Sequence, residues 1–273
     1  MSCWPSSLSK NVSLAAFLVL AAISTRGEGP PSARKPVLVE LFTSEGCSSC
    51  PPADIALAHL ATTQPVAGAE IVALALHVDY WNRLGWADPF SSPAFSARQS
   101  DYGRVRGGNR VYTPQVVVDG RKELVGSDEK EARHAVEEAA RLPKASIEIL
   151  QAVHGENAEL RLRVSALPPV TPGDTAELLL AVTEDRLATD VPRGENAGRR
   201  LVHNAVVREL AVVGAVEPGA PFETRRPLRL KANWKRNALH AVAFVQERKS
   251  RKVLGVARIS IQGEGTVASG PRA

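Results

Sequence analysis

The sequence predicts an α/β domain with a mixed sheet and helices on both faces, followed by an antiparallel all-β, sandwich-like domain. Three observations support this prediction. Up to residue 142, short β-branched apolar runs alternate with helical patterns. From residue 145 onward, strand-like runs follow one another with turn residues between them and without a helical pattern. Pro143 separates the two patterns and marks the boundary that we expect between two domains.

The first domain is expected to follow the order β-α-β-α-β-β-α. The dipeptide Asp119-Gly120 between two apolar runs is a strong signal for a β-hairpin. Ser127 is expected to cap the last helix, and Glu131 is placed to complete a capping box. Strands are expected at 36–42, at 70–78, at 115–118 and, after the turn at Asp119-Gly120, in a segment that ends at 125. Helices are expected at 53–61, 94–105 and 128–142, and an irregular aromatic loop at 79–93.

The second domain is expected to contain seven short antiparallel strands. These are predicted at 145–153, 158–166, 176–184, 201–213, 222–230, 238–247 and 253–261. The whole chain is then organised as a signal peptide (1–24), a leader (25–35), the α/β domain (36–142), the β-domain (145–262) and a flexible tail (263–273).

Composition places the chain among ordinary globular proteins. Its 273 residues suffice for two modest domains, and 44% of them are hydrophobic, which excludes a disordered or fibrous class. The formal net charge is +5, but the Lys and Arg residues are scattered and form no long basic run. We therefore expect no nucleic-acid partner. The oligomeric state is left open.

The amino terminus has the pattern of a secretory signal. Lys10 and the amino group precede an apolar run at 12–23, which is too short to span a bilayer comfortably. We expect cleavage after this run and export to the periplasm or the cell exterior, with no stable membrane span afterwards. An uncleaved anchor is the alternative.

Export changes the meaning of the three cysteines. Cys3 would leave with the signal, so Cys47 and Cys50 would be the only pair in the mature chain. Two intervening residues let the second sulfur reach the first, and the helix expected after the pair favours a thiolate at its amino end. The pattern predicts exchange with a protein or small-molecule thiol or disulfide, with Cys47 as nucleophile, Cys50 as resolving cysteine and no cofactor. No second cysteine pair or finger-like histidine pair indicates zinc.

Neighbouring residues weaken the expected activation of this pair. Pro51 and Pro52 follow Cys50 directly, and a residue before proline avoids the helical region, so we expect Cys50 at the N-cap or outside the helix. Glu45 and Asp54 lie nearby in sequence, and their negative charge opposes thiolate formation. A non-enzymatic binding module with a structural disulfide is therefore an alternative.

The strand–Cys-x-x-Cys–helix unit, together with Thr113-Pro114 before a strand, resembles the thioredoxin superfamily. The resemblance implies a thioredoxin-like first domain in which Pro114 is cis, faces the disulfide and shapes a substrate groove with Thr113. More narrowly, the chain resembles a secreted bacterial family catalogued as domain of unknown function 1223. That resemblance implies a fold and a site but no substrate. It is carried by the stretches Glu40–Asp54, His77–Trp81 and Val111–Gln115.

Four further residues are candidates for the same site. His77 ends a central strand, where ligand crevices of α/β sheets form, and Asp79 alternates onto the same face. We expect His77 to be a proton relay or a hydrogen-bonded structural residue, with Asp79 orienting it. The alternative is copper handling by His77 with both thiolates, as in secreted copper-delivery proteins of thioredoxin fold. Trp81 and Tyr112 are expected to line the groove, although Trp81 could instead belong to a small core of the aromatic loop.

Overall fold

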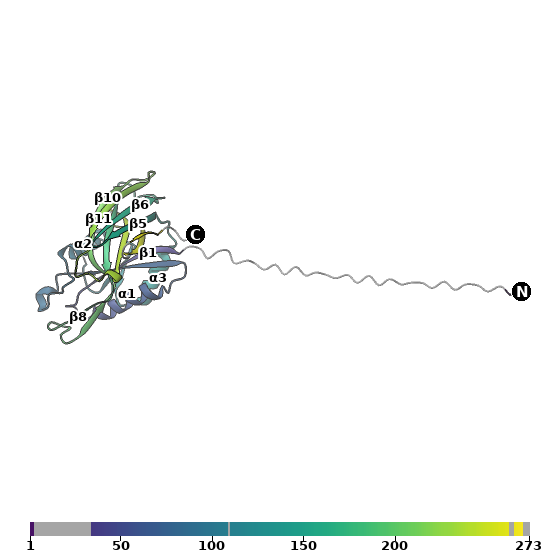
Figure 1. Cartoon of the computed structure of the whole chain (residues 1–273). Coiled ribbons are helices and arrows are strands. Elements are labelled where there is room, and N and C mark those ends of the chain that lie inside the picture. The colour runs from purple at the N-terminus through teal and green to yellow at the C-terminus, as the bar shows by residue number, and fades with distance from the viewer. Residues whose placement is uncertain (3–33, 109, 262–264, 270–273) are drawn as a thin grey trace. The chain divides into compact units, whose positions relative to one another are not determined.

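The computed structural model describes residues 1–2, 34–108 and 110–261, and the backbone of 265–269 (Figure 1). The described residues from position 34 onward form one compact unit. The expected signal peptide and leader lie outside the described residues, apart from positions 1–2 and 34–35.

Strands from both halves of the chain join in one mixed sheet of eight strands, in the order β13-β12-β7-β10-β2-β1-β3-β4. β1 and β2 are parallel, and β3 lies antiparallel to β1. We expected separate domains at 36–142 and 145–262, whereas both segments contribute to this sheet and to one compact unit. The strands are β1 (Lys35–Thr43), β2 (Ala69–His77), β3 (Gln115–Val118), β4 (Lys122–Val125), β7 (Ala176–Glu184), β10 (Val206–Val216), β12 (Leu239–Glu247) and β13 (Val253–Ser260).

The two halves of this sheet meet where β10 runs parallel to β2. The pairing is short: Val206 lies opposite Ala75, and the Ala75 N–H donates to the Ala205 carbonyl over 2.8 Å. Without β10, β2 would be an edge strand with almost every side chain buried. Such an apolar edge is a liability that proteins cover, and here β10 covers the part of it around Ala75.

Helices pack on both faces of the α/β half, as expected. Alternation along β1 sends Val37, Val39 and Leu41 toward α1 and α3, and Leu38 and Phe42 toward α2. The face that carries α2 also contacts apolar residues of β7, β10, β12 and β13, so the core continues into the second half. The helices are α1 (Pro51–Thr63), α2 (Pro93–Val105) and α3 (Glu129–Ala140).

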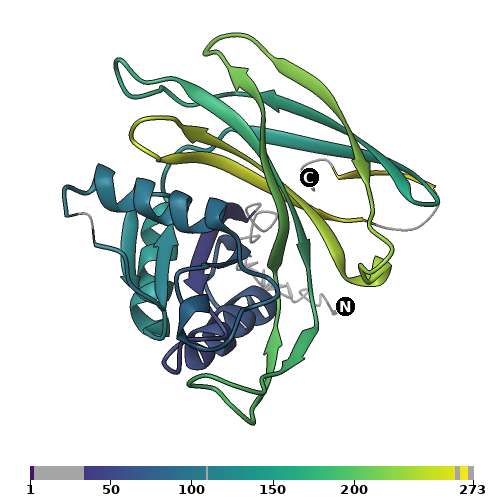
Figure 2. The same cartoon turned by 90° about the vertical axis from the view of Figure 1, so that its left-hand side faces the viewer.

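A separate antiparallel sheet of four strands, in the order β11-β6-β5-β14, packs on the second half of the large sheet. It lies in the upper part of Figure 2. β6 alternates strictly between exposed and buried residues, as a strand with one face on a core does. The strands are β5 (Ser146–His154), β6 (Asn157–Ser165), β11 (Phe222–Arg229) and β14 (Gly265–Ser269).

Several expected boundaries need correction. The tail expected to be flexible at 263–273 contains β14, which pairs with the edge of β5. The strand expected at 201–213 is two strands, because Ala205 has a positive φ of 53° that breaks the run. The N-cap of α3 is Asp128 rather than Ser127, and its carboxylate accepts from the Glu131 N–H over 3.0 Å. Within the loop at 79–93, a short 3₁₀ helix (Asn82–Leu84) is present.

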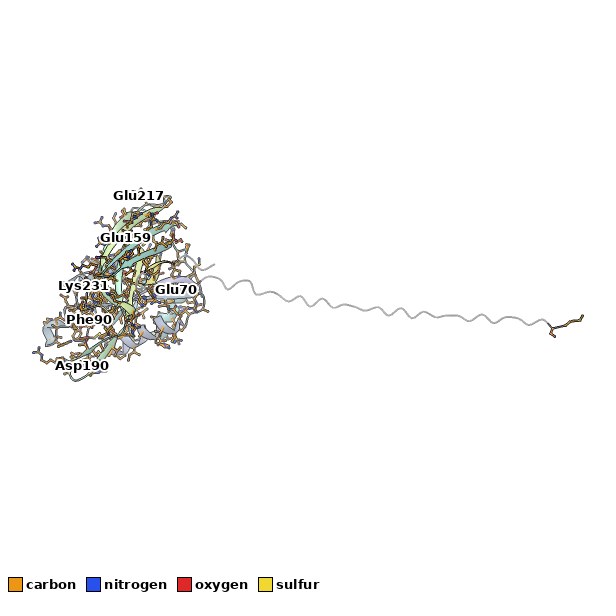
Figure 3. All side chains as sticks on the ribbon, viewed as in Figure 1. Glu70, Phe90, Glu159, Asp190, Glu217 and Lys231 are labelled. Carbon is orange, nitrogen blue, oxygen red and sulfur yellow. A yellow bond between two sulfur atoms is a disulfide. The ribbon has the colours of Figure 1, made fainter. Side chains whose placement is uncertain are left out.

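The strand that ends just before Ala205 belongs to a small hairpin that the sequence did not predict. β8 (Leu187–Asp190) and β9 (Arg200–His203) form a two-stranded sheet of their own. The hairpin lies beside α1 in Figure 2, and the exposed Asp190 at the end of β8 is labelled in Figure 3. This hairpin carries three residues to the candidate site: Glu195, Asn196 and His203.

A buried polar network ties α2 to both halves of the sheet. The Arg98 guanidinium donates to Glu40 of β1 over 2.6 Å and to Gln246 of β12 over 3.0 Å. Tyr102 also donates to Glu40 and accepts from Gln246. Glu40 and Arg98 are both buried, so each charge depends on the other for compensation.

We expect Arg98→Ala to lower the free energy of unfolding by about 3–5 kcal/mol, because it leaves the Glu40 carboxylate buried without its partner. Urea denaturation followed by circular dichroism measures the change. Arg104→Ala is the control, since Arg104 forms only a surface pair with Asp101 and its loss should change little. Equal losses for the two variants would contradict the role given to Arg98.

Candidate functional site

Cys47 and Cys50 form a disulfide between the end of β1 and the start of α1. Cys50 is the N-cap of α1, as expected, and its carbonyl accepts from the N–H groups of Ala53 and Asp54. Its dihedrals are helical (φ −77°, ψ −38°) although a proline follows, so the bonds of the first helical turn outweigh the pre-proline preference. Both cysteine side chains are buried, whereas the intervening Ser48 and Ser49 are exposed.

Pro114 lies against the same helical turn. The Thr113–Pro114 bond is cis, which confirms the expectation drawn from the resemblance. A Cβ added at Gly126 would lie 2.9 Å from Pro114 Cβ and 3.0 Å from Ala53 Cβ. Pro114 and the first turn of α1 therefore both pack against Gly126. They can come this close to its backbone only because Gly126 has no side chain.

Trp81 connects the aromatic loop to both the cysteine segment and Thr113. Its indole N–H donates to the Thr113 hydroxyl over 2.8 Å. Its Cβ lies so close to Gly46 that a Cβ added there would be only 3.1 Å away. Tyr112 lies beside Thr113, half-buried, and its carbonyl accepts from Gln99 over 2.8 Å. The structure thus brings Trp81, Thr113 and Pro114 next to the disulfide segment.

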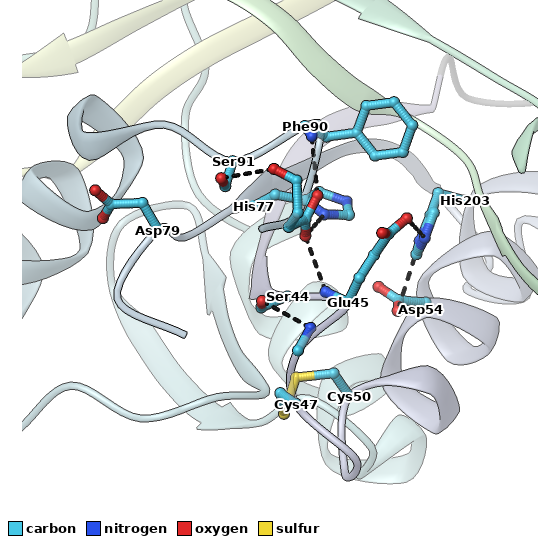
Figure 4. A network of polar contacts seen from close by, with 12 residues as sticks. Ser44, Glu45, Cys47, Cys50, Asp54, His77, Asp79, Phe90, Ser91 and His203 are labelled. Carbon is cyan, nitrogen blue, oxygen red and sulfur yellow. Dashed lines mark hydrogen bonds and ion pairs between the residues drawn. A yellow bond between two sulfur atoms is a disulfide. The ribbon is translucent and has the colours of Figure 1, made fainter. Parts of the chain in front are cut away.

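His77 is fully buried at the end of β2, and its partner is Asp88 rather than Asp79. His77 Nδ1 lies 2.7 Å from Asp88 Oδ2. Asp79 instead accepts from the Ser96 hydroxyl at the start of α2 and points away from His77 in Figure 4. In the described parts of the chain, no three or more His, Cys, Asp or Glu residues converge in a way that could hold a metal ion.

A buried acid–histidine cluster lies behind the disulfide (Figure 4). His203 of β9 places Nε2 at 3.1 Å from Glu45 Oε1 and Nδ1 at 3.7 Å from Asp54 Oδ2. The Trp86 indole N–H donates to the other Glu45 oxygen over 2.8 Å. Glu45 stands two residues before Cys47 and Asp54 one helical turn after Cys50, so His203 bridges the two sides of the cysteine segment.

The His77–Asp88 pair joins this cluster. The Glu45 N–H donates to Asp88 Oδ2 over 2.8 Å. The rings of His77 and His203 meet edge to face with centroids 4.8 Å apart, and Phe90 lies 5.4 and 5.9 Å from them. His77 Nε2 and His203 Nδ1 have no hydrogen-bond partner within the described residues. Two carboxylates therefore orient two histidines, and among the described residues the remaining nitrogen of each makes no hydrogen bond, although His203 Nδ1 faces Asp54 at 3.7 Å.

Burial and charge set the protonation of this cluster. Burial raises the pKa of Asp54, and the opposing charge of His203 only partly offsets it. For His77 burial acts to lower the pKa, but the charge and hydrogen bond of Asp88 outweigh burial and raise it. Burial would likewise raise the pKa of Asp88, yet His77 and two backbone N–H groups lower it. Asp54 thus holds its proton to a higher pH than an ordinary carboxyl, while His77 and Asp88 form an ion pair.

Sequence reasoning missed three residues of this site. Asp88 and Asn196 carried no local signal. His203 follows polar residues at the start of a strand, an unusual pattern that could have drawn attention to it. Asn196, in the loop between β8 and β9, donates to the carbonyls of Glu45 over 2.8 Å and Cys47 over 3.0 Å.

We expect Asp88→Asn to lower the free energy of unfolding more at about pH 5.5 than at about pH 9. The raised pKa of His77 makes its contribution complete below its ordinary value of 6.5 and lost as the pH rises through the raised pKa. The lowered pKa of Asp88 makes its contribution present above its ordinary value of 3.8 and lost as the pH falls through the lowered pKa. Denaturant titrations across this range measure the difference.

Asp190→Asn is the matched control for that measurement. Asp190 pairs with Arg200 on the surface at 2.7 Å, away from any buried histidine. Its substitution should have the same small effect at both pH values. A loss at Asp88 that did not vary with pH would show that no ion pair forms there.

Solved structures with the same fold are known. A protein from Agrobacterium tumefaciens, determined by a structural genomics consortium, is 25% identical with a TM-score of 0.62, over 88% of this chain and 96% of that one. HBP35 of Porphyromonas gingivalis is 15% identical with a TM-score of 0.63, over 86% and 78%, a likeness of fold alone. A comparison with curated proteins gives no match. The family model described as "Protein of unknown function (DUF1223)" matches residues 38–246, and the chain belongs to that family.

Proposed function

We propose that this protein exchanges a dithiol for a disulfide at Cys47 and Cys50 with a protein or small-molecule partner outside the cytoplasm. The observation that carries the proposal is the position of the disulfide, at the N-cap of α1 and beside Trp81, Thr113 and Pro114. A bond that closes a sequence separation of three removes little chain entropy. Stabilisation of the fold is therefore a weak reason for its presence.

The residues around this disulfide support a thioredoxin-like arrangement of the first half. The elements β1-α1-β2-α2-β3-β4-α3 follow the order β-α-β-α-β-β-α that the sequence pattern predicts for the first half. Pro114 precedes β3 and approaches the first turn of α1, where the resemblance places the substrate groove. The second half of the chain extends the sheet of this unit through β10.

The proposed exchange begins with attack by a partner thiolate on the Cys47 sulfur. The bond between the Cys47 and Cys50 sulfurs breaks, and its electron pair leaves on Cys50 as a thiolate. A second thiol of the partner, as thiolate, then attacks its own sulfur in the mixed disulfide and releases Cys47. The partner is oxidised to a disulfide and the Cys47–Cys50 pair is reduced. The reverse sequence oxidises the pair.

The electrostatics of the site favour this chemistry more than the sequence suggested. The N-terminus of α1 stabilises a thiolate at its cap. Asp54 adds no negative charge as long as it holds its proton, which its raised pKa favours. The Glu45 carboxylate is engaged by His203 and Trp86 rather than left free beside Cys47. The two nearby acids therefore oppose the thiolate less than free carboxylates would.

Export is part of the proposal because the apolar run at 12–23 has the pattern of a secretory signal and two cysteines pair readily in an oxidising compartment. The run itself lies outside the described residues. Within the described residues, no helix has both the length and the apolar character needed to cross a membrane.

We expect Cys50→Ser to trap a mixed disulfide at Cys47, because the resolving sulfur is gone. The variant is incubated with glutathione disulfide or a short peptide disulfide, and mass spectrometry identifies the adduct. Cys47→Ser is the matched control and should form its adduct at Cys50 about tenfold more slowly, since a thiolate stabilised at the helix cap is the better leaving group and the weaker nucleophile.

Reversible reduction of the unmodified protein completes the test. Dithiothreitol should open the disulfide while the circular dichroism spectrum stays native, and removal of the reductant should restore it. A disulfide that can be reduced only after unfolding, or an absence of adducts with both variants, would rule out exchange and leave a structural cross-link.

A further inference from the structure

We propose that the tip of the β8–β9 hairpin, residues 191–199, occupies the surface beside the disulfide at which an extended polypeptide binds, and moves aside to admit it. The inference rests on the proposed function and names its substrate class. It concerns the loop that joins β8 to β9, and the base of the hairpin stays in place through His203 and Glu45.

The tip satisfies three backbone groups of the cysteine segment with side chains. Asn196 donates its amide to the carbonyls of Glu45 and Cys47, over 2.8 and 3.0 Å. The Ser48 N–H donates to the Glu195 carboxylate over 3.0 Å. These two carbonyl groups and one N–H group lie on an irregular segment. The backbone of an extended peptide could form hydrogen bonds with the same groups, as in recognition by strand addition. The tip therefore fills these positions as a peptide would.

The disulfide itself is also covered in this structure. The side chains of Cys47 and Cys50 have no exposed surface. Thiol–disulfide exchange requires the attacking sulfur to contact the sulfur under attack. The arrangement in the structure is thus closed, and some part of the surroundings must move before exchange begins.

Most of the tip is exposed, although Gly194 packs closely against Trp86 of the aromatic loop. Only Val191 and Asn196 are buried among its residues, whereas Pro192–Glu195 and Ala197–Arg199 are exposed. The hairpin is a two-stranded sheet of its own, and such a sheet is marginally stable in water. Trp81 and Pro114, in contrast, belong to segments packed against the core or α1. Segments with few buried contacts open at a lower free energy than a core does.

Asn196 could instead be a permanent clip that holds Cys47 in a reactive position. The two roles predict opposite signs. If the tip competes with the substrate, loss of its bonds speeds the exchange. If it positions Cys47, loss of its bonds slows the exchange.

The experiment compares the rate of adduct formation in the Cys50→Ser protein with and without the double substitution Glu195→Ala and Asn196→Ala. Each rate is measured with a peptide disulfide and with glutathione disulfide. We expect the double substitution to speed the reaction with the peptide disulfide about tenfold, since three hydrogen bonds to the cysteine segment are lost. Glutathione disulfide, which needs less of the surface, should be accelerated less. Arg193→Ala, on the exposed tip, is the matched control and should change neither rate.

Amide hydrogen exchange gives a second test on the unsubstituted protein. The Ser48 N–H should exchange through a local opening, at least about tenfold faster than amides of β1. Protection of Ser48 equal to that of β1 would show that the tip does not open, and would overturn the inference.

The outcomes separate the two proposals. Exchange that occurs at the same or a lower rate in the double variant, or is accelerated equally for both reagents, overturns the assignment of the tip and leaves the proposed function intact. An absence of exchange in every form of the protein overturns the proposed function itself.

Discussion

The short pairing of β2 with β10 is the constraint on which the arrangement of the site depends. It comprises the register of Ala75 with Val206 and a hydrogen bond to Ala205. His203 stands two residues before Ala205, so this pairing fixes where β9 meets the cysteine segment. The buried hydrogen bonds from Arg98 of α2 to Glu40 of β1 and Gln246 of β12 also hold the two halves of the sheet together. The disulfide segment is therefore built by both halves of the chain.

The cluster behind the disulfide contains three buried acids, and each of them is stabilised in a different way. A buried carboxylate is costly unless it is paired, hydrogen-bonded or protonated. Asp88 is paired with His77, Glu45 is bonded by Trp86 and His203, and the pKa of Asp54 is raised. The three acids are thus stabilised by pairing, by hydrogen bonding and by a raised pKa, respectively. None of them is left as a free negative charge next to the sulfurs. Of the two acids that seemed to oppose a thiolate, Glu45 is hydrogen-bonded and Asp54 has a raised pKa.

Local sequence signals predicted the elements that position the cysteines. The apolar run before the pair, the proline-containing first turn of α1 and the Asp119-Gly120 turn all gave elements close to those observed. The family resemblance supplied the cis bond before Pro114 and its place near the helix. These features depend on neighbours in sequence or on an inherited pattern, and they needed no knowledge of how distant strands pair.

The strand–disulfide–helix unit and the residues in it could be predicted from local sequence signals. The residues that surround this unit could not: His203, which lies 158 residues from Glu45 in sequence, the amide of Asn196 and the partner of His77. Periodicity predicts that a segment is a strand, but it does not predict which edge of a sheet that strand joins. Strand pairing is a long-range event decided by which apolar edges remain uncovered. Here β2 offered such an edge, and the strand that covered it brought the second half of the site with it.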